Sequence, residues 1–113
     1  GYFMEALESR TLKGKDGVER IRAIMDVWRA RVPSDIEGAR VTSVKDYAKG
    51  IDGLPAENAL KITLADDSWF CLRPSGTEPK IKVYFATRGS SEAEAKERLE
   101  RLRRFVMRRV EGG

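Results

Sequence analysis

Residues 69–85 read WFCLRPSGTEPKIKVYF and place two apolar runs on either side of a polar stretch. Trp69–Leu72 and Ile81–Phe85 are rich in aromatic and aliphatic residues, which favour strands. The stretch that joins them, Arg73–Lys82, contains two prolines and a glycine, which are typical of turns. These residues therefore predict two neighbouring strands joined by a stiff loop.

The loop also carries the residue types of an anion cradle. Arg73 offers a planar fork of donors that matches two phosphate oxygens at once. Hydroxyl donors, a glycine that admits backbone N–H groups and two lysines accompany it. The candidate phosphate-binding residues are Arg73, Ser75, Gly76, Thr77, Lys80 and Lys82. The same composition suits a plain surface turn, so composition alone leaves both interpretations open.

The ten residues Arg73–Lys82 resemble the C-terminal phosphate-binding loop of the α-D-phosphohexomutases, the phosphoglucomutase and phosphomannomutase family. Gly14–Gly17, with the isoleucines that follow, is similar to the helix entry of that family's last domain. Tyr2 and its neighbours look like the end of the third domain. Lys80–Tyr84 is similar to the phosphoglucomutase/phosphomannomutase branch more than to the glucosamine branch.

The resemblance implies an α+β, TBP-like β-α-β4-α fold, with an antiparallel four-stranded sheet and two helices on one face. Residues 1–13 would be the tail of a preceding domain or a short first strand, and residues 14–113 the phosphate-binding domain. The chain begins at Gly1 rather than Met, and we expect a piece of a longer protein.

The resemblance also implies a function. The family moves a phosphoryl group between the 1- and 6-positions of a hexose phosphate, through a hexose 1,6-bisphosphate. A phosphoserine and Mg²⁺ in other domains serve the chemistry, and the fourth domain anchors the non-transferred phosphate and closes the cleft. Motifs for the nucleophile, the metal and sugar recognition are absent. We therefore expect no catalytic or metal-binding residue and no cofactor in this chain, which would be inactive alone.

The implied partners are the phosphosugar and the three other domains of the parent. In the loop, the Glu78 carboxylate would repel phosphate, so we expect it to orient Lys80 or a backbone amide.

The composition of the chain excludes several other kinds of site and fold. The chain has 113 residues, 41% hydrophobic and 35% charged, enough for one folded domain. It contains no His, which excludes a Ser-His-Asp triad and a His-ligated zinc site. The single Cys71 excludes an internal disulfide and favours a reducing, cytoplasmic setting. No apolar run approaches a membrane span, so no membrane partner is expected.

Two helices are predicted from apolar spacing. The first begins at Asp16, with Glu19 completing a capping box, and ends before Pro33. We expect its apolar stripe to face the core, with Trp28 large enough to be shared with a neighbouring domain. The second follows a capping box of Ser91 and Glu94. Its inner stripe is Ala95, Leu99, Leu102, Val106 and Val110, with Phe105 flanking, and four Glu-to-Lys or Glu-to-Arg pairs at four-residue spacing are expected along it.

Between the helices the pattern predicts strands. Ala39–Tyr47 has β-branched content, and residues 60–64 alternate apolar with polar side chains. Gly50–Asn58 is predicted to be a loop, and Asp66–Ser68 a turn with Asx-type bonding rather than a metal site.

The net charge of +4 fits a phosphate-bearing ligand or nucleic acid. The alternative function is a nucleic-acid-binding module that uses the basic C-terminal helix. Its arginines, however, alternate with acids and complement the helix dipole, so we expect no nucleic-acid partner.

Overall fold

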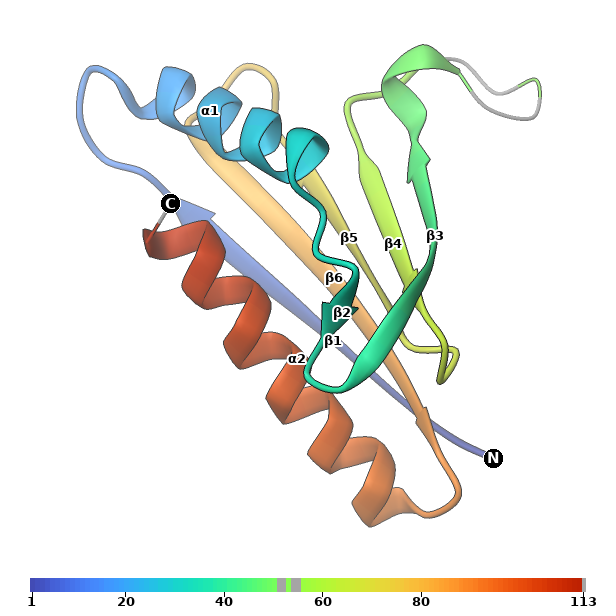
Figure 1. Ribbon diagram of the computed structural model, residues 1–113. Helices are drawn as coiled ribbons and strands as arrows, with labels where there is room; N and C mark the ends of the chain where they lie inside the picture. The colour runs from blue at the N-terminus through green and yellow to red at the C-terminus, as the bar shows by residue number, and fades with distance from the viewer. Residues whose placement is uncertain (51–52, 54–55, 113) are drawn as a thin grey trace.

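The computed structural model describes residues 1–50, 53 and 56–112 and shows two helices packed on an antiparallel sheet (Figure 1). Along the chain the elements are β1 (Tyr2–Thr11), α1 (Gly17–Ala30), β2 (Asp35–Ile36), β3 (Ala39–Asp46), the 3-10 turn η1 (Tyr47–Lys49), β4 (Leu60–Leu64), β5 (Trp69–Pro74), β6 (Lys80–Gly89) and α2 (Glu92–Gly112). The expected α+β class is confirmed.

The sheet has six strands in the order β1-β6-β5-β4-β3-β2, and every neighbouring pair is antiparallel. The expectation of four strands is therefore corrected. β2 is a two-residue addition at one edge, and β1 is a full strand at the other. β1 pairs with β6 along its whole length, from Tyr2 opposite Gly89 to Thr11 opposite Lys80.

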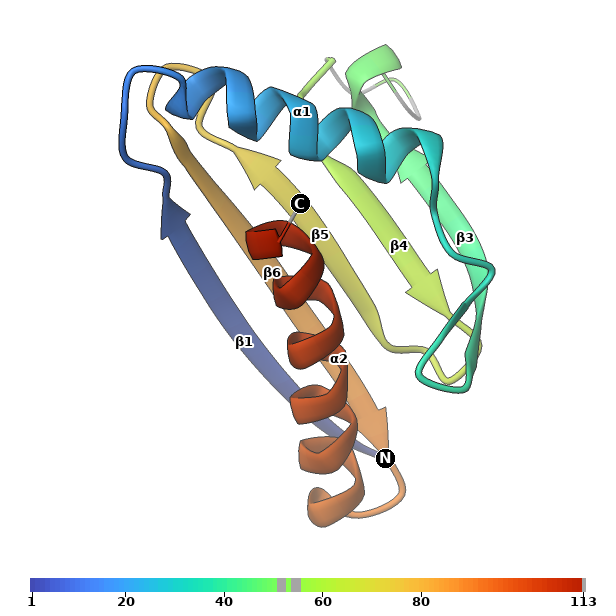
Figure 2. The same cartoon turned by 60° about the vertical axis from the view of Figure 1, so that its left-hand side comes forward.

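Both helices cover the same face of the sheet, as expected (Figure 2). α2 runs along β6 and β1, whereas α1 crosses the sheet near the end that carries the β5–β6 loop. No helix of the described residues lies on the opposite face. A ligand or partner can therefore reach this sheet at the loops at its ends or on its uncovered face.

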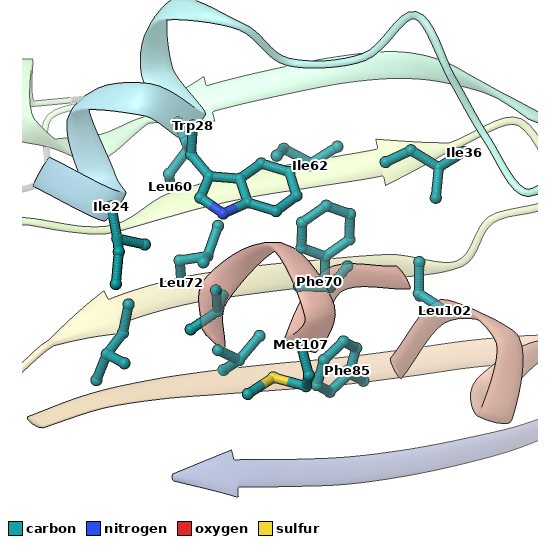
Figure 3. Packing of buried hydrophobic residues seen from close by; sticks show 14 of the residues in the cluster. Ile24, Trp28, Ile36, Leu60, Ile62, Phe70, Leu72, Phe85, Leu102 and Met107 are labelled. Carbon is teal, nitrogen blue, oxygen red and sulfur yellow. The ribbon is translucent and has the colours of Figure 1, made fainter. Parts of the chain in front are cut away.

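The core lies between the helices and the covered face, and its centre is aromatic (Figure 3). Trp28 of α1 meets Phe70 of β5 edge to face, with ring centroids 5.4 Å apart. Phe85 of β6 stacks beside Phe70 at 6.4 Å. Trp28 is only 1% exposed, so the expectation that it could be shared with a neighbouring domain is wrong. The Trp28 ring finds its packing partners inside this domain.

α1 differs from its prediction at its start. Asp16 is the residue that precedes the helix, but its side chain makes no capping hydrogen bond. Its φ of −97° and ψ of 11° depart from the extended geometry that brings an N-cap side chain over the first turn. The Asp16 carbonyl accepts from Arg20 N at 2.9 Å. The capping box predicted for Asp16 and Glu19 is therefore not formed.

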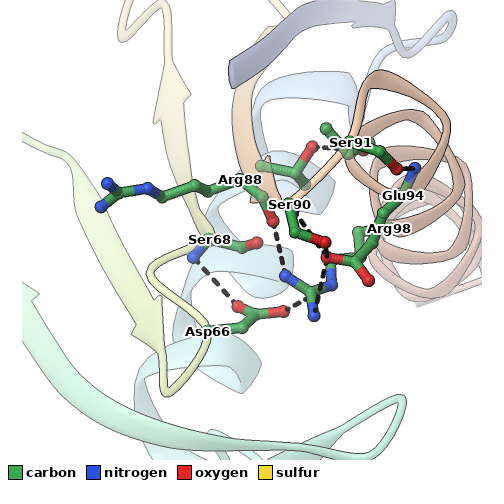
Figure 4. A network of polar contacts seen from close by, with 9 residues as sticks. Asp66, Ser68, Arg88, Ser90, Ser91, Glu94 and Arg98 are labelled. Atoms are coloured by element: carbon green, nitrogen blue, oxygen red, sulfur yellow. Dashed lines mark hydrogen bonds and ion pairs between the residues drawn. The ribbon is translucent and has the colours of Figure 1, made fainter. Parts of the chain in front are cut away.

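The start of α2 is capped more nearly as predicted (Figure 4). Glu94 N donates to Ser91 Oγ at 3.1 Å. The Glu94 carboxylate accepts from Ser90 N at 2.8 Å, one residue earlier than in a capping box. Of the four expected ion pairs along this helix, Glu94–Arg98 forms at 3.5 Å, and the other three are not found among the described residues. The predicted inner stripe is buried, with Met107 added to it.

The turn between β4 and β5 is confirmed as an Asx-type turn. Ser68 N donates to Asp66 Oδ1 at 3.0 Å, and Asp67 adopts a positive φ of 70°. Arg98 links this turn to α2, because its Nε lies 3.7 Å from Asp66 Oδ2 and its Nη1 donates to the Arg88 carbonyl (Figure 4). In the predicted loop Gly50–Asn58, residues 51, 52, 54 and 55 lie outside the described residues.

Candidate functional site

The predicted loop connects β5 to β6 and is closed by its own backbone. Pro74 lies opposite Ile81 in the strand register, and Ser75 N donates to the Lys80 carbonyl at 2.9 Å. Glu78 N donates to Ser75 Oγ at 3.3 Å, so this hydroxyl braces the turn. Gly76 has a φ of 86°, which favours glycine, although a Cβ there would meet no atom within 4 Å. The loop is a tight turn that leaves space around Gly76.

Neighbouring elements fix the far end of the loop. Leu12 N, just beyond β1, donates to the Pro79 carbonyl at 2.8 Å. A Cβ on Gly17, the first residue of α1, would lie 2.5 Å from the Leu12 carbonyl oxygen and 2.6 Å from Pro79 Cβ. Only glycine allows α1 to begin so close to both. This role of Gly17 was not predicted from the sequence, where its signal is the second glycine of the Gly14–Gly17 segment.

The loop and the two strands enclose a concavity of about 350 Å³. Four of the six candidate residues come together there: Arg73, Ser75, Lys80 and Lys82. The remaining lining residues are Pro74, Glu78 and Tyr84. Gly76 instead faces a smaller hollow of about 140 Å³ beside α1, and Thr77 lines neither space. Three cationic side chains thus converge on one hollow, where their combined field attracts an anion.

Glu78 makes neither of the contacts expected of its carboxylate among the described residues. Lys80 N does bond to Glu78, but to the backbone carbonyl, at 2.7 Å. The carboxylate therefore lines the concavity without a fixed partner in this part of the chain, and it lowers the local positive field.

Arg73 has a partner that the sequence analysis did not find. Its Nη2 lies 2.5 Å from Oε1 of Glu57, which precedes β4. Both side chains are near half exposed, at 55% and 46%. No local pattern connects these residues, because they are separated in the sequence and meet only when β4 and β5 pair.

A second groove of about 270 Å³ adjoins the first on the uncovered face. Arg73 and Tyr84 line both, and the other lining residues are Tyr47, Glu57, Ala59, Lys61, Trp69 and Cys71. Burial raises the pKa of the Cys71 thiol, and Glu57 raises it further, against the opposing effect of Lys61 and Arg73. Cys71 therefore stays a neutral thiol near pH 7 and is a poor nucleophile.

Among the described residues, no group of three or more His, Cys, Asp or Glu side chains could hold a metal ion. The resemblance assigns Mg²⁺ to another domain of the parent enzyme, and no role in holding it is assigned to these residues.

The basic end of α2 is partly used inside the fold. Arg103 Nη2 donates to Glu8 Oε2 at 2.9 Å, and this bond is the main reason that the pKa of Glu8 is lowered. Arg109 lies over the Trp28 ring at 4.3 Å and donates to the Arg31 carbonyl at 2.8 Å. These contacts give Arg103 and Arg109 a structural role within the domain.

Within the part of the chain that the structure describes, no helix is long and apolar enough to cross a membrane.

Comparisons with known proteins agree with the family resemblance of the sequence. The family model described as "Phosphoglucomutase/phosphomannomutase, C-terminal domain" matches residues 9–105. A phosphoglucomutase of Staphylococcus aureus (strain bovine RF122 / ET3-1) is 37% identical over 74% of this chain and 17% of its own length. A phosphoglucomutase of Staphylococcus haemolyticus (strain JCSC1435) is 33% identical over 76% of this chain and 18% of its own length. The chain thus spans less than a fifth of these relatives, and it belongs to the phosphoglucomutase/phosphomannomutase family, whose C-terminal domain it matches.

Proposed function

We propose that this chain is the phosphate-anchoring domain of a hexose-phosphate mutase. The parent enzyme moves a phosphoryl group between the 1- and 6-positions of the sugar, in the cytoplasm. This domain holds the phosphate that is not reacting. The observation that carries the proposal is the convergence of Arg73, Ser75, Lys80 and Lys82 on one concavity, in a chain of this family.

The chemistry of the concavity suits a phosphate that must be held and then released. The Arg73 guanidinium can donate two hydrogen bonds to one phosphate. Lys80 and Lys82 add a positive electrostatic field that does not require one fixed hydrogen-bond geometry. The backbone of the loop is already braced by Ser75 and by Pro79, so little entropy is lost when a ligand docks. Binding at a remote phosphate can position the reacting end of the same sugar. Movement of the whole domain then closes and reopens the cleft.

The other functions of the parent are assigned to other domains. Phosphoryl donation, the Mg²⁺ site and sugar recognition need residues that this chain does not offer, and the hexose 1,6-bisphosphate intermediate would form between domains. Within the parent we place residues 14–113 in the phosphate-anchoring domain, and residues 1–13 lead into it as its edge strand β1. A coupled mutase assay on this chain alone should show no turnover above the blank.

An amide NMR titration with inorganic phosphate and with glucose 1-phosphate tests the proposal. A single phosphate site cut from a closed cleft should bind on the order of millimolar, about −4 kcal/mol. Shifts should be confined to residues 73–82 and be similar for both ligands. Arg73→Ala should weaken binding about tenfold, because charge-assisted hydrogen bonds are lost. The matched control Arg104→Ala removes an exposed arginine of α2 and should change affinity little.

Two results would contradict the proposal. Arg73→Ala with unchanged phosphate affinity would remove Arg73 from the site. Shifts spread along residues 98–109, or none at all, would leave only the family fold and would favour the nucleic-acid alternative.

A further inference from the structure

Arg73 lines both grooves, and its guanidinium pairs with a carboxylate of the second one. It lies on the Glu57 carboxylate, with Nη2 2.5 Å from Oε1. Glu57 lines the second groove but not the phosphate concavity, whereas Arg73 lines both. Without ligand, the strongest phosphate-binding group of the domain is therefore already paired with an internal anion.

The position of Glu57 is set by the fold. Its N–H donates to the Tyr47 carbonyl at 2.9 Å, and its carbonyl accepts from Ala59 N at 2.9 Å. The next residue, Asn58, accepts from Arg29 Nη2 at 2.6 Å. These bonds tie the segment to η1 and to α1, so the carboxylate is presented to Arg73 from an anchored backbone.

We propose that Glu57 is an internal counter-ion that competes with the ligand phosphate for Arg73 and so sets the affinity of the site. This inference rests on the proposed function, because it assumes that phosphate uses Arg73. Binding then exchanges one anion for another. The guanidinium leaves Glu57 as it turns toward the concavity, and on release of phosphate the carboxylate takes the guanidinium back.

Such competition suits a phosphosugar whose phosphate must dissociate from the site before the sugar can reorient. Exposed ion pairs shift an equilibrium by a factor of about 1.4 to 5. Arg73 would then be free in about a sixth to two-fifths of the unliganded molecules, and the apparent dissociation constant rises in proportion. Removal of the carboxylate should tighten phosphate binding about two- to sixfold.

The test compares Glu57→Gln with Glu78→Gln in the 113-residue chain. Both variants remove one negative charge beside the site, but Glu78 lines the concavity without pairing to Arg73 in the described part of the chain. Two quantities are measured at constant ionic strength: the Arg73 Nε resonance without ligand, and the dissociation constant of inorganic phosphate from amide shifts.

Glu57→Gln should move the Arg73 Nε resonance without ligand and tighten phosphate binding beyond any gain in Glu78→Gln. Equal gains in the two variants with an unmoved Arg73 resonance would mean a general field effect and would overturn the inference. So would unchanged phosphate affinity in Glu57→Gln. If the unsubstituted chain shows no shift of residues 73–82 with phosphate, the proposed function fails instead, whatever the Arg73 resonance does.

Discussion

Replacing Trp28 by alanine tests whether α1 is held to the sheet from within this domain. The indole is 1% exposed, lies edge to face against Phe70, and has the Arg109 guanidinium over its ring, 4.3 Å from the centroid. The substitution removes a ring from the centre of the core and leaves the helix backbone intact, because alanine is a good helix former.

The expected loss of stability is about 4 kcal/mol. An aromatic side chain of this size buries about 150–250 Å², worth roughly 4–6 kcal/mol at about 25 cal/mol per Å². The extended-chain reference overstates this by about 10–40%. The lost aromatic pair adds about 1 kcal/mol, and the better helix propensity of alanine returns about 0.5 kcal/mol. The result agrees with the roughly 3–5 kcal/mol typical of such truncations.

Urea denaturation followed by far-UV circular dichroism measures the effect, and the melting temperature should fall by about 15–30 °C. Val27→Ala is the matched control, because Val27 precedes Trp28 on the same helix and is 45% exposed. It should change the free energy of unfolding by less than about 0.5 kcal/mol. A Trp28→Ala cost below about 1 kcal/mol, or equal to that of the control, would refute the core assignment.

Two further predictions concern the elements around the core and the site. Glu8→Gln should lower the free energy of unfolding by about 1 kcal/mol at pH 7, because the partly buried bond to Arg103 loses its charge. The pKa of Glu8 is lowered in the fold, so its contribution to stability is present at neutral pH and is lost as the pH falls through and below the ordinary range of a Glu carboxyl. Urea midpoints plotted against pH should therefore slope less in the variant than in the unsubstituted chain, and identical slopes would contradict this. Gly17→Ala should cost about 1–3 kcal/mol by forcing α1 away from Leu12 and Pro79, and should shift amide signals of the β5–β6 loop; a variant with unmoved loop signals would show that α1 does not position the loop.

The parts of the fold with regular local patterns could be predicted from the sequence. The inner stripe of α2 and the alternation of β4 follow the helical and strand periods closely. β1 could not be predicted as a full strand, because two of its inward positions hold Glu8 and Arg10. Those charges pair with each other and with Arg103 and Glu111, which come from the far end of the chain. An alternation that depends on distant partners is not visible locally.

The loop residues of the candidate site could be predicted from the sequence, but their contacts could not. The loop residues are contiguous, so their identity showed where an anion could bind. The structure sorts them further, since Thr77 lines neither hollow and Ser75 braces the turn. Glu57 could not be found in advance, because its meeting with Arg73 depends on the register of β4 against β5 and on the anchoring of its own segment.

The pairing of β1 with β6 has a consequence for the order in which the chain folds. β1 is synthesised first, but its partner residues follow roughly 70 to 90 positions later, so closing that contact is entropically the most demanding step. β4, β5 and β6 are joined by short turns and can zip together locally. During synthesis at about 5–20 residues per second, β1 waits several seconds without its partner. Until β6 is made, the backbone N–H and C=O groups of β1 lack their strand partner, and Met4 and Ala6 lack the core against which they pack.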